Sequence, residues 1–287
     1  MVKKFKQDDY PKREIEACKR VLMEILNLLK EYADHIALVG GWVPYYMVPE
    51  KSDQHTGSLD VDICFDLQWI SEVAYETILN TLRENGYYQT NQNKPFQWWK
   101  DVIVDDGKPI SVEVDLLSSE YGGRGKNHEH QNIQDIKARK ARGSDLIFGM
   151  GEKNRFKEII LEGRLPNGDR DSVRFKIAGV VPFLVMKGMA IGRGKPKDAY
   201  DIEFVIANYP DGFDALVSEF KEDLDHPLVL EGLGKIRTKF ESVEHTGPSD
   251  ITRFEDIQPK DERDIRARKA YETVNEFLDA LKINRVL

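Results

Sequence analysis

The stretch Leu38–Asp66, LVGGWVPYYMVPEKSDQHTGSLDVDICFD, joins a pair of glycines to two aspartates that lie one residue apart. The apolar run before the glycines predicts a buried strand that ends in a sharp bend. Because Gly41 has no Cβ, a backbone or a phosphate can approach it closely. The alternation of polar and apolar residues in Leu59–Phe65 predicts a half-buried strand. Side chains at i and i+2 of a strand point the same way, so Asp60 and Asp62 share one face.

Paired carboxylates on one strand face predict a site for a divalent cation. Two such groups repel each other when both are ionised, and a hard cation with oxygen ligands, such as Mg²⁺, removes that cost. A second strand is predicted over residues 110–117, with Glu113 and Asp115 on the same face. We favour Asp115 as the third ligand because its side chain is shorter and lies nearer the strand end, with Glu113 as the alternative. Three acids on neighbouring strands can hold two ions that activate a nucleophile and stabilise a leaving phosphate; the alternative interpretation is a strand face with solvated acids.

The order of these motifs resembles a known family. Gly40-Gly41, Asp60-Val61-Asp62 and Asp115 resemble the nucleotidyltransferase superfamily of the DNA polymerase β type. The resemblance is closer to the AbiEii-like nucleotidyltransferase toxins, which carry a later lysine and a Lys/Arg-Asp-x-x-Asp segment. This chain offers Lys187 and then Lys197–Asp201, with the sequence KDAYD. The matched region runs from about residue 38 to 206, and its specificity lies in the order and spacing of four short motifs.

The resemblance implies a fold, an activity and a set of roles. The expected fold is α/β (α+β): a mixed β-sheet core flanked by helices over residues 1–178, then a helical domain over 179–287 that forms the other wall of a cleft. The implied reaction moves a nucleotidyl group from an NTP to an acceptor hydroxyl with Mg²⁺ or Mn²⁺ as cofactor. The acceptor is expected to be an RNA (tRNA-like) end, and the enzyme toxin-like, held in check by a separate antitoxin. The implied site residues are Asp60, Asp62 and Asp115 for both metal binding and catalysis; Lys187, Asp198 and Asp201 for catalysis; and Gly40, Gly41, Ser58, Arg193 and Lys195 for the nucleotide.

Two positions depart from the family pattern. The family commonly has serine after the glycine turn, where this chain has Trp42, and many relatives carry an arginine shortly before the Asp-x-Asp, where this chain has residues 55–58, HTGS. Thr56 or Ser58 is the candidate replacement for the missing hydroxyl. Three alternatives stay open: a small-molecule nucleotidyltransferase of the antibiotic-modifying sort, a metal-dependent glycosyltransferase, and a non-catalytic binding protein with the same fold, which the missing serine favours. The glycosyltransferase is disfavoured because it explains neither the glycine pair nor Lys187.

Lys187 stands inside an apolar helix predicted from residue 179 onward. Burying an ammonium without a partner is costly, so the sequence predicts a phosphate, a structural carboxylate or an exposed tip for its amine. Asp198 and Asp201 lie one turn apart on the next predicted helix, and either can orient Lys187 through a charge-assisted bond. The sequence does not choose between these two aspartates.

The segment 118–143 is polar, rich in glycine and basic. It contains Arg124, Lys126 and the run Lys137–Arg142. Because it follows Asp115 directly, it predicts a flap that contacts triphosphate or RNA backbone. An exposed loop without a role is the alternative.

Composition sets the broad class. The chain has 287 residues, 40% of them hydrophobic, and a formal net charge of −8, which argues against a surface that binds nucleic acid all over. Only two cysteines, Cys18 and Cys64, are present, which fits buried free thiols in a reducing cytoplasm. No apolar run approaches a membrane span, so we expect a cytoplasmic protein without membrane contact. Helices are predicted over 15–32, 69–85, 213–225, 227–240 and 259–283, with a linker over 244–250.

Overall fold

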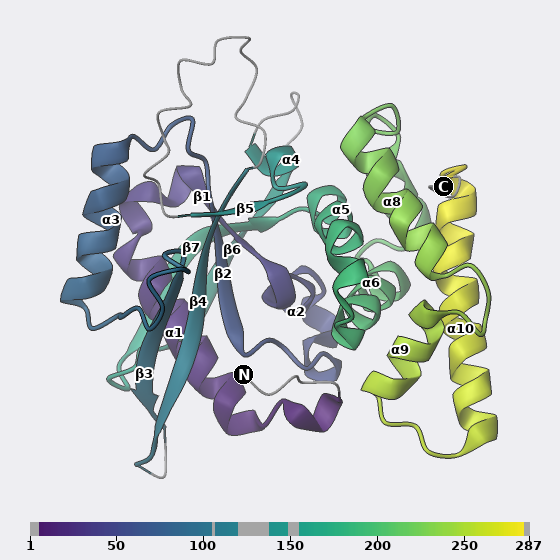
Figure 1. Ribbon diagram of the computed structural model, residues 1–287, viewed down its shortest axis with the longest axis horizontal. Coiled ribbons are helices and arrows are strands. Elements are labelled where there is room, and N and C mark those ends of the chain that lie inside the picture. Colours follow the sequence, from purple (N-terminus) through teal and green to yellow (C-terminus); the bar gives the residue numbers. More distant parts are fainter. Residues whose placement is uncertain (1–5, 105–106, 120–137, 149–154, 284–287) are drawn as a thin grey trace. The chain divides into compact units, whose positions relative to one another are not determined.

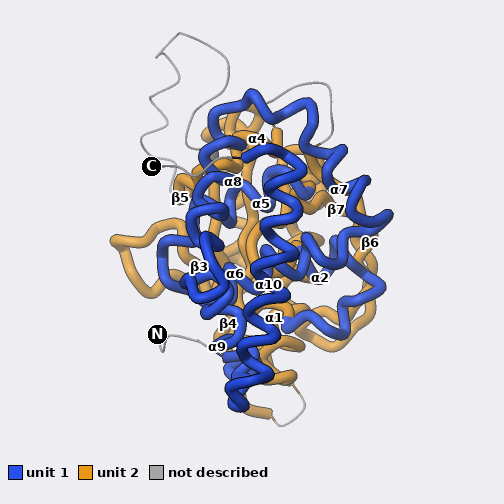
Figure 2. Tube along the Cα trace, turned by 90° about the vertical axis from the view of Figure 1, so that its right-hand side faces the viewer, with its two compact units in different colours: residues 1–10, 44–56, 180–287 blue, residues 11–43, 57–179 orange. Residues whose placement is uncertain are grey.

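The computed structural model describes residues 6–104, 107–119, 138–148 and 155–283. The chain forms two compact units (Figure 2). The sheet unit comprises residues 11–43 and 57–179, and the helical unit comprises residues 1–10, 44–56 and 180–287. The sheet unit ends at Gly179, one residue after the predicted domain boundary at residue 178. Residues 1–10 and 44–56, which we expected in the core with the sheet, belong to the helical unit.

The sheet unit is built on a seven-stranded mixed sheet of the order β3-β4-β2-β1-β7-β6, in which β5 pairs with β4 (Figure 1). Neighbours β2 and β4, β1 and β7, and β4 and β5 are parallel, and the remaining pairs are antiparallel. This confirms the α/β class with a mixed sheet. The strands are β1 Ile36–Val39, β2 Asp60–Phe65, β3 Gln97–Ile103, β4 Pro109–Ser119, β5 Arg139–Ala141, β6 Phe156–Arg164 and β7 Arg170–Ala178.

Both predicted helices of this unit form, with shifted ends. Helix α1 Lys12–Leu28 packs on the sheet with the buried face that its apolar spacing predicts, and a 3₁₀ turn follows it at Lys30–His35. Helix α3 Glu72–Glu84 begins where the Ser71 hydroxyl accepts a hydrogen bond of 3.2 Å from the Ala74 amide. A short helix, α4 Asp145–Phe148, follows β5.

The helical unit contains the C-terminal helices. They are α5 Val180–Ala190, α6 Pro196–Asn208, α7 Phe213–Phe220, α8 Pro227–Lys239, α9 Thr246–Phe254 and α10 Lys260–Ala280. The short helix α2 Val43–Met47 and the 3₁₀ turn Pro49–Gln54 lie between β1 and β2 in the chain. No helix among the described residues is long and apolar enough to cross a membrane.

The linker predicted over residues 244–250 is wrong, because most of it forms the start of α9. Pro248 lies in the first turn, where its missing N–H costs nothing. Gly247 packs so closely on the preceding helix that a Cβ would lie 2.6 Å from the Lys239 carbonyl oxygen. Ile251 and Phe254 are fully buried, so tertiary packing outweighs the turn-forming composition of the segment.

Candidate functional site

Four carboxylates lie side by side on one face of the sheet. Strands β2 and β4 run parallel, with Asp60 opposite Glu113 and Asp62 opposite Asp115. Neighbouring strands are about 4.8 Å apart, and residues paired across them face the same side. The structure therefore brings together the three aspartates predicted as metal ligands, and it adds Glu113, the alternative ligand, as the fourth acid.

The glycine bend lies directly against one of these acids. Strand β1 ends at Val39, opposite Asp62, and the chain turns into a 3₁₀ turn at Gly40–Trp42. Gly40 has a φ of +72°, and a Cβ built on it would lie 2.0 Å from Oδ2 of Asp62. The glycine that makes room is thus Gly40, whereas the sequence pointed to Gly41, and the group it makes room for is the Asp62 carboxylate.

Replacing Gly40 with alanine is expected to displace the Asp62 carboxylate. The alanine at position 40 would suffer both backbone strain and a clash with Asp62. Gly194→Ala is a matched control with strain alone, because Gly194 has a φ of +74° and open space where its Cβ would be. Strain of this kind costs about 1–3 kcal/mol, so the control should lose about that much unfolding free energy and Gly40→Ala clearly more. Urea denaturation of both variants measures the difference, and equal losses would contradict the close packing of Gly40 on Asp62.

Trp42, at the position where the family commonly has serine, belongs to the core. Its side chain is fully buried, and its indole Nε1 donates a hydrogen bond of 3.3 Å to Sγ of Cys18. It therefore fixes the bend against helix α1. Both cysteines are buried free thiols, as predicted.

Polar neighbours hold three of the four acids. The Ser58 hydroxyl, predicted to bind nucleotide, donates a hydrogen bond to Oδ1 of Asp60. Gln97 Nε2 donates a 2.5 Å hydrogen bond to Oε1 of Glu113, and Arg139 Nη1 lies 3.6 Å from Oδ2 of Asp115. Ser58 and Gln97 are thus positioning groups for the acids, and the sequence did not single out Gln97.

Burial and the neighbouring negative charges raise the pKa of Glu113. Burial, and next the charges of Asp115 and Asp60, raise its pKa from 4.5 to about 7. Its Oε2 atom is buried and has no hydrogen-bond partner among the described residues. Glu113 is therefore a carboxyl group that can exchange a proton near neutral pH.

Glu113→Gln is expected to stabilise the fold at alkaline pH. The folded-state pKa of Glu113 lies above the unfolded one, so the folded state binds more protons between pH 4.5 and 7 and the free energy of unfolding falls as pH rises through that window. Glutamine removes this cost, and the expected gain is about 1–2 kcal/mol at pH 8 and close to zero at pH 4.5. Urea denaturation at the two pH values measures it, with Glu162→Gln on the exposed side of β6 as control; a gain independent of pH would contradict the assignment.

The donor set of this face fits a hard divalent cation. All four groups are carboxylates, Oε2 of Glu113 is buried without a hydrogen-bond partner among the described residues, and Gly40 leaves space beside Asp62. No three His, Cys, Asp or Glu side chains in the described ranges already converge as a ligand group. Rotation about the side-chain dihedrals is therefore required to gather these acids around an ion.

The helical unit holds a second polar cluster, centred on Lys187. Its amine donates hydrogen bonds of 2.7 Å to Oδ1 of Asp198 and of 2.7 Å to Oδ2 of Asp201. Lys197 Nζ and His55 Nε2 lie 2.7 and 2.9 Å from the other oxygen of Asp201, which is fully buried. Both aspartates thus orient Lys187, and of the three partners predicted for its amine, the structure shows the carboxylate.

Charge balance explains how so many ionisable groups share a buried site. Burial disfavours the charged forms, but the two aspartates outweigh it for Lys187, whose pKa lies well above its ordinary value. The lysines likewise hold the pKa of Asp201 well below its usual range against the effect of burial. Burial and the charge of Lys197 lower the pKa of His55 to about 4, so the ring is neutral and donates its Nε2–H to Asp201. Two lysines and two aspartates leave no net charge.

The other predicted anion-binding residues are exposed. Arg193 ends the 3₁₀ turn Ile191–Arg193, and Lys195 precedes α6. Within the described part of the chain, neither forms an ion pair, so both are available to an anion. Arg124, Lys126 and Lys137 of the predicted flap lie outside the described residues, while Arg139 and Lys140 form part of β5.

Comparison with known proteins gives only a weak structural similarity. No family model matches the chain, and no curated protein matches it significantly. A solved structure of an antigenic nucleotidyltransferase-like protein from Paracoccidioides brasiliensis aligns over 94% of both chains, with 12% sequence identity and a TM-score of 0.44. A similarity of this size does not establish a shared family.

Proposed function

We propose that this protein is a metal-dependent nucleotidyltransferase that transfers a nucleotidyl group from an NTP to an acceptor hydroxyl. The observation that carries the proposal is the pairing of Asp60 and Asp62 with Glu113 and Asp115 beside the Gly40 bend. Four acids at such spacing are costly to the fold when they are unoccupied. A cation bound with its nucleotide would offset the repulsion among these carboxylates.

The acids divide between holding the ion and moving a proton. Asp60, Asp62 and Asp115 would hold Mg²⁺ or Mn²⁺, which when bound neutralises triphosphate charge and favours ionisation of the acceptor hydroxyl. The acceptor oxygen attacks the α-phosphorus, the bond to pyrophosphate breaks, and the hydroxyl proton must leave. Glu113 Oε2 is our candidate for the atom that takes it, because Glu113 lies opposite Asp60 on the shared face and this oxygen has no hydrogen-bond partner among the described residues.

Cationic side chains are assigned to the phosphates. Arg193 and Lys195 are exposed beside glycines and carry charge that would balance the triphosphate. Lys187 already donates to two aspartates, so its part in the reaction would be exercised through Asp198 and Asp201.

For the acceptor we propose an RNA end. The overall charge of −8 does not favour RNA, but local cations lie beside the acids: Arg139 is 3.6 Å from Asp115 and the adjoining Lys140 is exposed. Toxin-like behaviour under the control of an antitoxin is part of the same proposal and rests on the sequence resemblance. A small-molecule nucleotidyltransferase is the second candidate, and a non-catalytic protein with this fold is the third.

Reaction with labelled NTPs separates these candidates. The protein is incubated with Mg²⁺ and each α-labelled NTP in turn, with total RNA in one series and aminoglycosides in another, followed by mass spectrometry of the acceptors. A nucleotidyl mass gain on RNA supports the proposal, and a gain on aminoglycosides supports the second candidate. Asp60→Ala should abolish either gain, while Asp171→Ala, an exposed acid of β7, should not. The absence of Mg²⁺-dependent NTP consumption would leave the non-catalytic interpretation.

A further inference from the structure

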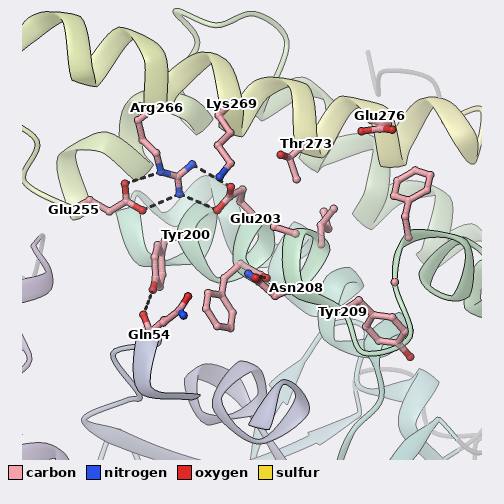
Figure 3. A pocket seen from close by; sticks show the side chains of 15 residues that line it. Gln54, Tyr200, Glu203, Asn208, Tyr209, Glu255, Arg266, Lys269, Thr273 and Glu276 are labelled. Carbon is pink, nitrogen blue, oxygen red and sulfur yellow. Dashed lines mark hydrogen bonds and ion pairs between the residues drawn. The ribbon is translucent and has the colours of Figure 1, made fainter. Parts of the chain in front are cut away.

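The helical unit contains a cavity of about 510 Å³ that the proposed reaction does not use (Figure 3). Helix α6 forms one wall, with Tyr200, Glu203 and Asn208, and helix α10 forms the other, with Arg266 and Thr273. All its lining residues belong to the helical unit, whereas the four acids belong to the sheet unit. Its size falls within the range of about 300–1,000 Å³ that is usual for small-molecule sites.

Three of the lining residues, Glu203, Glu255 and Arg266, form an ionic clamp. Arg266 donates from Nη1 and Nη2 to the two oxygens of Glu203 at 3.0 and 2.9 Å, and from Nε to Glu255 at 2.8 Å. A guanidinium bound in this bidentate way has little capacity left for a further anion. The clamp therefore shapes the cavity and does not serve as a phosphate site.

Polar side chains of α10 line the other wall of the cavity. Lys269, Thr273 and Glu276 follow one another at helical spacing and line the cavity. Across the described residues, no ion pair reaches Lys269 or Glu276, and no hydrogen bond involves the Thr273 hydroxyl. These three side chains offer a donor, a hydroxyl and an acceptor to a ligand.

The opposite wall is aromatic. Tyr200, Phe204, Tyr209 and Phe213 line the cavity, and Asn208 adds an amide among them. The Asn208 Nδ2 donates a 2.8 Å hydrogen bond to the Phe204 carbonyl, which leaves its Oδ1 as an acceptor. Aromatic walls with a few polar groups suit a flat ring that carries hydrogen-bonding atoms on its edge.

The charge of the lining excludes phosphate groups. Three carboxylates, those of Glu203, Glu255 and Glu276, stand against two cations, Arg266 and Lys269, which leaves one net negative charge. We propose that this cavity binds an uncharged heteroaromatic molecule of the nucleoside class. Its exocyclic amino group would donate to Glu276 or Asn208, and a ring or carbonyl acceptor would face Lys269.

The test measures nucleoside binding to the whole 287-residue chain in EDTA. Adenosine, guanosine, cytidine and uridine are titrated by calorimetry, and at least one is expected to bind with a Kd of about 0.1–1 mM. Ala207→Trp places a large ring in the cavity from an exposed position of α6 and should weaken binding at least about tenfold, and Glu276→Gln should weaken it several-fold. Glu272→Gln, an exposed acid of α10 outside the lining, is the matched control and should bind as the wild type does.

Two comparisons keep this site distinct from the proposed active site. Asp60→Asn should retain nucleoside binding, even though it should lose nucleotidyl transfer. Binding that Asp60→Asn removes and Ala207→Trp leaves intact would overturn the proposal, because the nucleoside would then occupy the acid site. Failure of all four nucleosides to bind, or tighter binding of AMP than of adenosine, would also overturn it.

Discussion

Asp62→Asn is expected to lower Mg²⁺-dependent NTP turnover by at least about 100-fold while the fold stays intact. Loss of a group that merely supports a metal ligand already costs about 10–100-fold, and Asp62 is proposed as a ligand itself. Its carboxylate packs against Gly40 and faces Asp115, so asparagine fits the same space with one charge fewer. In the absence of metal the variant should therefore melt at the same temperature as the wild type or higher, because one repulsive charge is gone.

Thermal unfolding with and without Mg²⁺ gives this prediction a readout besides activity. A ligand at 100 times its Kd stabilises a folded protein by about 2.7 kcal/mol, so the wild type should gain several degrees with Mg²⁺ and Asp62→Asn should gain none. Asp171→Asn, which changes an exposed acid of β7, is the control and should respond as the wild type does. Equal Mg²⁺ stabilisation of all three proteins would show that the four acids do not form the metal site.

Asp201→Asn is expected to destabilise the helical unit by about 3–5 kcal/mol. The fully buried carboxylate accepts from Lys187, Lys197 and His55, and its loss leaves a largely buried excess of positive charge. Removing one partner of a buried ion pair typically costs this much, because the remaining charge stays unpaired. Urea denaturation followed by circular dichroism measures the loss.

A compensating variant tests whether charge balance is the cause. Lys197→Met together with Asp201→Asn restores neutrality, so the double variant should be more stable than the sum of the two single effects implies. Lys195→Met changes an exposed lysine of the same segment and should alter the unfolding free energy by less than about 0.5 kcal/mol. Strict additivity of Lys197→Met and Asp201→Asn would contradict the network as the source of the stability.

The strand face with the acids was predictable from the sequence because it depends on short-range periodicity. Alternation fixes which residues of a strand share a face, and the spacing of Asp60 and Asp62 places both on the same one. Pairing with Glu113 and Asp115 needed one further step, the parallel register of β2 and β4. The alternation in this strand allowed either Glu113 or Asp115 to be the ligand. The register shows that both lie on the same face of the sheet as Asp60 and Asp62.

The Lys187 cluster shows where sequence reasoning reaches its limit. The aspartates one turn apart on α6 were visible as partners for a buried amine, because helical spacing places them on one face. His55 is 146 positions from Asp201, and no local pattern connects the two. The sequence also pointed to Gly41 where the structure has Gly40 in the close contact, since the backbone angle and the neighbouring carboxylate become known only with the tertiary structure.

The path of the chain has a consequence for dissecting the protein. It passes from one unit to the other after residues 10, 43, 56 and 179, so neither unit is encoded by one uninterrupted piece of the gene. A fragment that starts at Val180 would carry Asp201 without His55, whose imidazole is hydrogen-bonded to it. A fragment that stops at Gly179 would keep residues 44–56 without the helices of their own unit. Truncation therefore yields two incomplete units, so the function of each unit is better tested by point substitutions in the whole chain.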